Sequence, residues 1–120
     1  MDFNEAKKYL LAKPESEESY PFYPDTPVFK LKGKIFAILS TDEGKPRLNL
    51  KCDPDQALAL RDIFDGVIPG YHMNKKHWNT LLLQSDIPEP EIERMIDHSY
   101  QLIFDKLPKA TQKLLKMQGA

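Results

Sequence analysis

A strict two-residue alternation in the segment 46–52 constrains the fold of this chain most strongly. Side chains alternate between the two faces of a β-strand, so a strand with this pattern buries one face and leaves the other polar. The apolar positions are Leu48, Leu50 and Cys52, and the polar positions are Arg47, Asn49 and Lys51.

Other strand-like runs surround this one. Residues 28–32 and 34–41 predict two strands with Gly33 between them, and 67–73 and 77–84 predict a hairpin around Asn74-Lys75-Lys76. Residues 15–27 contain three prolines, so we expect them to cross the edge of the sheet as a short extended piece and a turn.

Helical patterns separate the strands. A first helix is expected over residues 2–13, with a capping box between Asp2 and Glu5. A second is expected after Asp53 as the N-cap, with Gln56 completing the cap, and a third after Asp86. Residues 109–120 are expected to form a basic C-terminal tail or a short helix. The order of elements predicts one α+β domain, residues 1–120, in which helices cover one face of an antiparallel sheet.

Charge is distributed unevenly along the chain. The net charge is −1, but residues 27–52 carry six bases and two acids, a net charge of +4. A near-neutral protein can therefore present a basic surface if these segments lie together. The absence of a secretory signal, of an apolar run of about 18–20 residues and of a second cysteine favours a cytoplasmic protein with no membrane partner.

The uncovered face of the predicted sheet is the candidate binding surface. Cations on a sheet face suit phosphate backbones, and an exposed aromatic residue adds base stacking. The same pattern also fits a polar face that only keeps the protein soluble, and Trp78 also fits a core anchor. The candidate nucleic-acid-binding residues are Lys30, Lys32, Arg47, Lys51, Lys75, Lys76, His77 and Trp78.

Catalytic and metal chemistry have little support in the sequence. His72 and His77 flank two lysines, which would repel a cation, and a metal site needs three or four ligands. Cys52 lies on the inward face of its strand and has no recognisable base beside it in the sequence, so an enzyme using Cys52, His72 and His77 is the weakest hypothesis. We expect no enzyme activity, no metal and no cofactor.

Five short motifs stand out along the chain. They are Gly33-Lys34-Ile35-Phe36-Ala37, Leu50-Lys51-Cys52-Asp53-Pro54, Pro69-Gly70-Tyr71-His72-Met73-Asn74-Lys75-Lys76-His77-Trp78, Ile87-Pro88 and Ser99-Tyr100. Together these motifs resemble the MmcQ/YjbR family of small bacterial proteins, and the resemblance covers the chain from the first helix to about Leu107. The hairpin motif is fairly specific, because several unusual residues occur in a fixed order.

The resemblance implies a CyaY-like (frataxin-like) α+β fold and a role as a proposed "double wing" DNA-binding protein. Lys51, Lys75, Lys76 and His77 match the family motifs and are the positions that this role would use. The iron handling of frataxins is not implied, because the acidic first helix and strand edge expected there are sparse here.

The sequence therefore predicts a small monomeric binding protein that contacts DNA through a basic sheet face and hairpin. The alternative is a domain that binds another protein or a small ligand through the same face, with Tyr71 and Trp78 as anchors.

Overall fold

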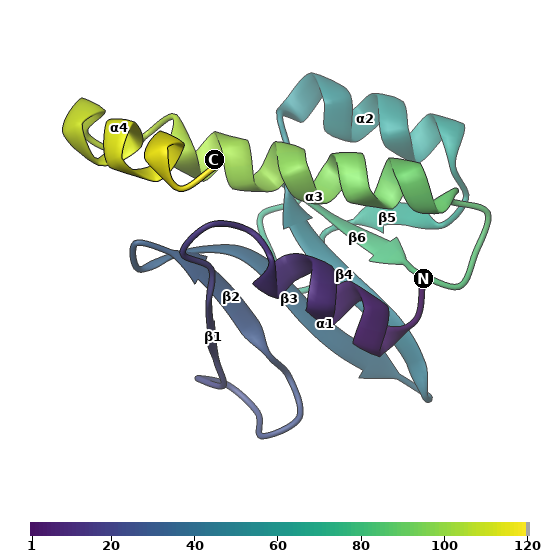
Figure 1. The fold of residues 1–120 in the computed structure, drawn as a ribbon. Coiled ribbons are helices and arrows are strands. Elements are labelled where there is room, and N and C mark those ends of the chain that lie inside the picture. The colour runs from purple at the N-terminus through teal and green to yellow at the C-terminus, as the bar shows by residue number, and fades with distance from the viewer. Residues whose placement is uncertain (120) are drawn as a thin grey trace.

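The structure, a computed structural model, describes residues 1–119. Within these residues the chain forms four helices and six strands (Figure 1). The strands pair antiparallel in the order β1-β2-β3-β4-β6-β5, which confirms the predicted α+β class. The helices are α1 (Phe3–Leu11), α2 (Pro54–Ile63), α3 (Glu89–Phe104) and α4 (Lys109–Met117). The strands are β1 (Glu17–Ser19), β2 (Val28–Leu31), β3 (Lys34–Asp42), β4 (Lys45–Lys51), β5 (Val67–Pro69) and β6 (Trp78–Leu82).

The helices pack on one face of the sheet, as predicted. Figure 1 shows α1 and α3 crossing in front of the strands, with α3 against β2, β3 and β4, and α1 against β3. The helix α2 packs on β5, and the side chain of Asn79 on β6 donates to the carbonyl of Ala57 in α2. We call this side of the sheet the helix face and the opposite side the open face.

Cross-strand register assigns the strand residues to these faces. Leu48 lies opposite Leu39 and Leu81, and all three are fully buried on the helix face. Asn49 lies opposite Ile38 and Thr80 on the open face. The predicted alternation in β4 is therefore confirmed.

The open face is not uniformly exposed, which differs from the sequence-based expectation. Ile38 and Thr80 are buried there. The loop 70–77 folds back over this region, because the N–H of Tyr71 donates to Thr80 Oγ1 at 2.9 Å and its carbonyl accepts from Asn49 Nδ2 at 3.5 Å. Part of the face is thus occupied by the protein's own loop.

A bulge in β3 determines how α3 meets the sheet. Phe29 pairs with Ala37 and Lys30 with Ile35, so Phe36 is the extra residue on its strand. The hydroxyl of Ser99 on α3 donates to the Phe36 carbonyl at 2.6 Å and accepts from the Lys51 N–H at 2.9 Å. A buried serine therefore bridges β3 and β4 where their ladder ends.

The predicted hairpin strands were too long. Only 67–69 and 78–82 are strands, and residues 70–77 form a loop. His72 has a φ of 57°, and the Asn74 side chain accepts from the Lys76 N–H at 2.9 Å. A left-handed residue and an asparagine turn interrupt the pairing that the apolar pattern had suggested.

The two predicted helix caps had different outcomes. The capping box of Asp2 and Glu5 forms as expected. Asp53 caps α2, but the prediction that Gln56 completes the cap was wrong, since the N–H of Asp53 donates to Nε2 of His98 at 3.3 Å. His98, which is distant in sequence, therefore accepts the hydrogen bond from the Asp53 N–H that Gln56 was expected to accept.

Candidate functional site

A pocket at one end of the sheet brings together cationic, amide and aromatic side chains. Its volume is about 230 Å³. Lys51 ends β4, and Trp78 begins β6 directly opposite it in the register. Asn74 and His77 come from the loop 70–77, and Lys106 comes from the turn after α3. We call these five residues, Lys51, Asn74, His77, Trp78 and Lys106, the cationic pocket.

Two ammonium groups converge in this pocket. The pKa of Lys51 is lowered, first by burial, then by the charge and the side-chain contact of Lys106, and then by the charge of Lys34. Among residues 1–119, the ion pairs within 4.0 Å include none of these three lysines. An anion bound between Lys51 and Lys106 would relieve their repulsion and supply the missing counter-charge.

The position of Lys106 follows from the anchoring of α3. Ser99 contacts the backbone of Lys51, and Lys106 lies seven residues further along the chain, roughly 10 Å at the rise of an α-helix. Lys106 thereby lines the same pocket as Lys51, the last residue of β4. The serine bridge therefore sets the separation of the two lysines.

Arg61 on α2 holds the loop side of the pocket. Its Nε donates to Asn79 Oδ1 at 2.7 Å, and its Nη2 donates to the carbonyls of Trp78, at 3.3 Å, and Lys75. The Cys52 N–H donates to the His77 carbonyl at 2.7 Å. The backbone that carries His77 and Trp78 is thereby tied to both α2 and β4.

Trp78 is a pocket residue and not a core anchor. It is half-buried, and its register partner Lys51 places it on the open face. Gly70 packs directly against Trp78, since a Cβ added at Gly70 would lie only 2.7 Å from the Trp78 Cβ. The core-anchor interpretation of the sequence was therefore wrong, and part of the indole is available to a ligand.

The structure brings Lys51, His77 and Trp78 together, but separates the other predicted residues from them. Arg47 pairs with Asp42 at 2.9 Å, and its guanidinium lies 5.9 Å from the ring centre of Tyr71. Lys32 lies in the β2–β3 turn and pairs with Glu15 at 3.0 Å. Lys30 on β2 lies opposite Glu17 of the edge strand β1.

Lys75 and Lys76 lie on the other side of the loop. They line a hollow of about 220 Å³, which we call the α2 hollow. Its remaining lining residues are Pro54, Asp55, Leu58 and Arg61. The loop 70–77 thus separates two concave surfaces, with lysines in both.

The sequence did not identify Lys34, Asn74 or Lys106 as site residues. Lys34 and Asn74 lie inside the quoted motifs, so the motifs carried that signal. Lys106 lies 55 residues after Lys51 and reaches it only because α3 crosses the sheet. No local pattern indicates that contact.

Cys52 shows the environment of a structural thiol. It is 5% exposed, and burial is the main cause that raises its pKa to about 11. The thiolate is the nucleophilic form, so this group is unreactive near neutral pH. Among residues 1–119, three or more His, Cys, Asp or Glu side chains do not come together in a group that could hold a metal ion.

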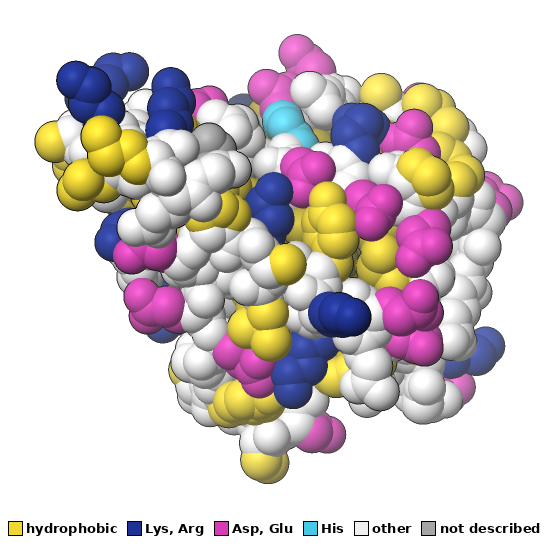
Figure 2. Space-filling view, viewed as in Figure 1, with side chains coloured by type: hydrophobic (Ala, Val, Ile, Leu, Met, Phe, Trp, Pro, Cys, Tyr) yellow, Lys and Arg dark blue, Asp and Glu magenta, His cyan; other side chains and the backbone are white. Residues whose placement is uncertain are grey.

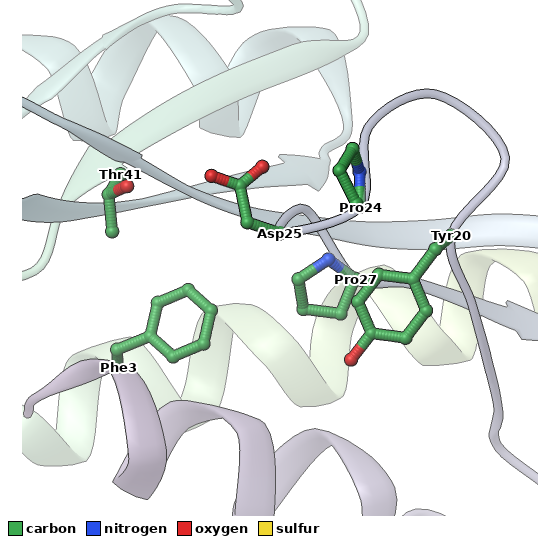
Figure 3. Close-up of a pocket in the computed structure, with 6 residues that line it drawn as sticks. All are labelled: Phe3, Tyr20, Pro24, Asp25, Pro27 and Thr41. Carbon is green, nitrogen blue, oxygen red and sulfur yellow. The ribbon is translucent and has the colours of Figure 1, made fainter.

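A third hollow is apolar and lies between α1 and the proline-rich segment 20–27. Figure 3 shows the ring of Phe3 on α1 facing Pro27 and Tyr20 across it. Its volume is about 360 Å³, and Asp25 is its one charged lining residue. Within the described part of the chain it has no lining cation to pair with a charged ligand, so the cationic pocket is the better candidate.

The helix-covered surface differs from this pocket in charge. Figure 2 shows that side, where Asp and Glu side chains are frequent over the helices and lysines gather towards α4.

None of the helices among residues 1–119 is long and apolar enough to span a membrane.

The fold and site define a small α+β protein with a one-sided sheet that ends in a cationic pocket. The family model described as YjbR matches residues 11–102. The chain belongs to the YjbR family, which confirms the resemblance seen in its motifs.

Relatives and solved structures match over most of the chain. The uncharacterized protein YbdF of Escherichia coli O157:H7 is 40% identical over 111 residues, 92% of this chain and 91% of the relative. The uncharacterized protein YjbR of Escherichia coli K12 is 34% identical over 115 residues, 96% of this chain and 98% of the relative.

The crystal structure of a Deinococcus radiodurans protein with a DUF419 domain matches with a TM-score of 0.87. It is 32% identical, and the match covers 96% of this chain and 88% of that one. A Pseudomonas syringae crystal structure matches with a TM-score of 0.76 and 30% identity, over 85% of this chain and 98% of that one.

Proposed function

We propose that this protein binds nucleic acid, with a backbone phosphate held in the cationic pocket. The observation that carries the proposal is the convergence of Lys51 and Lys106 without a carboxylate partner among residues 1–119. Lysines that have no acidic partner within the protein are free to neutralise phosphates of a nucleic acid. This neutralisation releases counterions and makes the affinity for nucleic acid depend on salt.

The remaining pocket residues support the same ligand. The amide of Asn74 offers a neutral donor and acceptor, and His77 adds an imidazole ring that can form hydrogen bonds. Side chains of these types contact phosphate and sugar in protein–nucleic acid complexes and set the register of the ligand. The pocket therefore combines charge with positioning groups.

The test is titration of labelled DNA and RNA at low and moderate salt, for the native chain and for the double variant Lys51→Gln, Lys106→Gln. We expect the variant to bind more weakly and to lower the slope of log affinity against log salt by about one to two. The matched control is Lys8→Gln, Lys45→Gln, which removes the same charge from exposed positions outside the pocket.

Two results would refute the proposal. One is the absence of any nucleic-acid binding by the native chain at low salt. The other is a pocket variant whose affinity and salt slope equal those of the control.

The alternative is a protein- or small-ligand-binding surface on the same face. Tyr71 supports it, because this aromatic residue is 58% exposed beside Arg47 and next to the pocket. Aromatic residues and arginine are enriched in the centres of protein interfaces. A Tyr71→Ser variant that binds nucleic acid normally but loses a purified protein partner would favour this function.

A further inference from the structure

Resting on this proposed function, we propose that the cationic pocket receives one unpaired nucleotide, with its phosphate at Lys51 and Lys106 and its base against Trp78. The ligand would then be single-stranded nucleic acid and not a duplex.

Size limits what can enter the pocket. Its volume of about 230 Å³ lies below the range of roughly 300–1,000 Å³ found for sites that enclose drug-sized ligands. That space suits one phosphate group with a single base lying against Trp78, whereas a double helix is far too wide to enter. Lys51 is also half-buried, so it is less accessible to a convex rod than a fully exposed lysine.

Trp78 supplies a surface that a duplex cannot use. Bases in a duplex are stacked on one another and present only their edges in the grooves. An unpaired base exposes its ring face, and stacking on an aromatic side chain tolerates any base. Because Trp78 and Lys51 are direct cross-strand partners, their Cβ atoms lie about 5 Å apart, which suits the phosphate and base of one nucleotide.

The α2 hollow continues the cationic path. Asn74 and His77 line the cationic pocket, while Lys75 and Lys76, between them in sequence, line the α2 hollow. The two concave surfaces are therefore separated by little more than the loop itself. A strand leaving the cationic pocket across this loop would bring its next phosphate to Lys75 and Lys76.

The frame of the pocket is formed before any ligand arrives. Arg61 fixes the carbonyls of Lys75 and Trp78, and its partner Asn79 is 1% exposed and bonded to Ala57. Ordering costs that would weaken binding are thus small on the loop side.

Trp78 is the single tryptophan of the chain, so fluorescence excited at the red edge, where tyrosine does not absorb, reports on this pocket alone. The native chain is titrated with a DNA single strand, the duplex of the same sequence, an abasic strand of equal length and a nucleoside monophosphate. We expect the single strand to quench Trp78 and to bind most tightly. Loss of one stacked base should cost roughly 5- to 150-fold in affinity, so the abasic strand should bind correspondingly more weakly.

Variants locate the effect at the indole. Trp78→Leu should bring the affinity for the normal strand down to that for the abasic strand, and Trp78→Phe should restore part of it. If Trp78→Leu does not fold, the comparison of normal and abasic strands on the native chain decides the question by itself.

The outcomes separate this inference from the function on which it rests. In one outcome the duplex binds as tightly as the single strand or more tightly, with an affinity that depends on Lys51 and Lys106 but with no change in Trp78 fluorescence. That result overturns the single-strand inference and leaves the proposed function standing. Tighter binding of the monophosphate than of the strand reassigns the pocket to a free nucleotide. No binding of any of the four ligands refutes both proposals.

Discussion

Replacement of Ser99 by alanine tests how the sheet, α3 and the cationic pocket are joined. The Ser99 hydroxyl donates to the Phe36 carbonyl at 2.6 Å and accepts from the Lys51 N–H at 2.9 Å. Ser99 itself is fully buried, so water cannot easily replace the missing hydroxyl. The substitution removes both hydrogen bonds and leaves two backbone groups without their partner.

The expected cost follows from those two groups. A buried polar group left unsatisfied costs about 1–3 kcal/mol, so the pair should lower the free energy of unfolding by about 2–6 kcal/mol. For a domain of this size the midpoint of thermal unfolding should fall by roughly 6–30 °C. Binding should weaken as well, because the bridge sets the position of Lys106 relative to Lys51.

The assay is urea unfolding followed by circular dichroism, with thermal unfolding as the second measure. Ser85→Ala is the matched control, since the exposed Ser85 hydroxyl also donates to a backbone carbonyl, that of Leu82. Surface changes of this kind usually stay within about 0.5 kcal/mol. If Ser99→Ala were as mild as Ser85→Ala, this serine would not be the residue that joins β3, β4 and α3.

Three further predictions concern groups around the pocket. Arg61→Met should destabilise the fold by about 2 kcal/mol or more, because it leaves Oδ1 of buried Asn79 without its donor, whereas Arg94→Met, at an exposed pair with Glu91, should change urea stability little. Burial, and less strongly Arg94, lower the pKa of His98 against the opposing effect of Asp53. The contribution of His98 to stability should therefore be complete above pH ~6.5 and be lost as the pH falls through the lowered folded-state pKa. Urea midpoints across this pH range should show that loss, and the loss should be smaller in His98→Gln. Cys52, with a pKa raised to about 11, should not react with a thiol reagent at pH 8 until urea unfolds the chain; rapid reaction of the folded protein would contradict its burial.

Much of the fold could be predicted from local patterns. The alternation in 46–52, the capping box at Asp2 and the Asp53-Pro54 helix start depend on neighbouring residues only, and each formed as expected. The prediction of long hairpin strands was wrong because left-handed His72 and the Asn74 turn outweighed an apolar pattern that was compatible with pairing. Local chemistry within the loop was stronger than the strand signal.

The candidate site was less predictable. The sequence indicated Lys51, His77 and Trp78, because they lie in predicted strands and in recognisable motifs. It could not show that Arg47 and Lys32 are paired with acids, or that Lys75 and Lys76 lie on the other side of the loop. Those outcomes depend on where each side chain points after the chain has folded.

The sequence by itself determined the class of fold. Apolar residues repeat about every two positions in the strands and about every 3.6 positions in the helices, and these repeats determine which sides are buried together. Only the tertiary structure decided which cations meet. Lys106 reaches Lys51 across 55 residues because Ser99 anchors α3 at the end of β4, and the end of that helix then lies beside the strand. Contacts of this kind depend on packing between distant elements, and no local pattern encodes them.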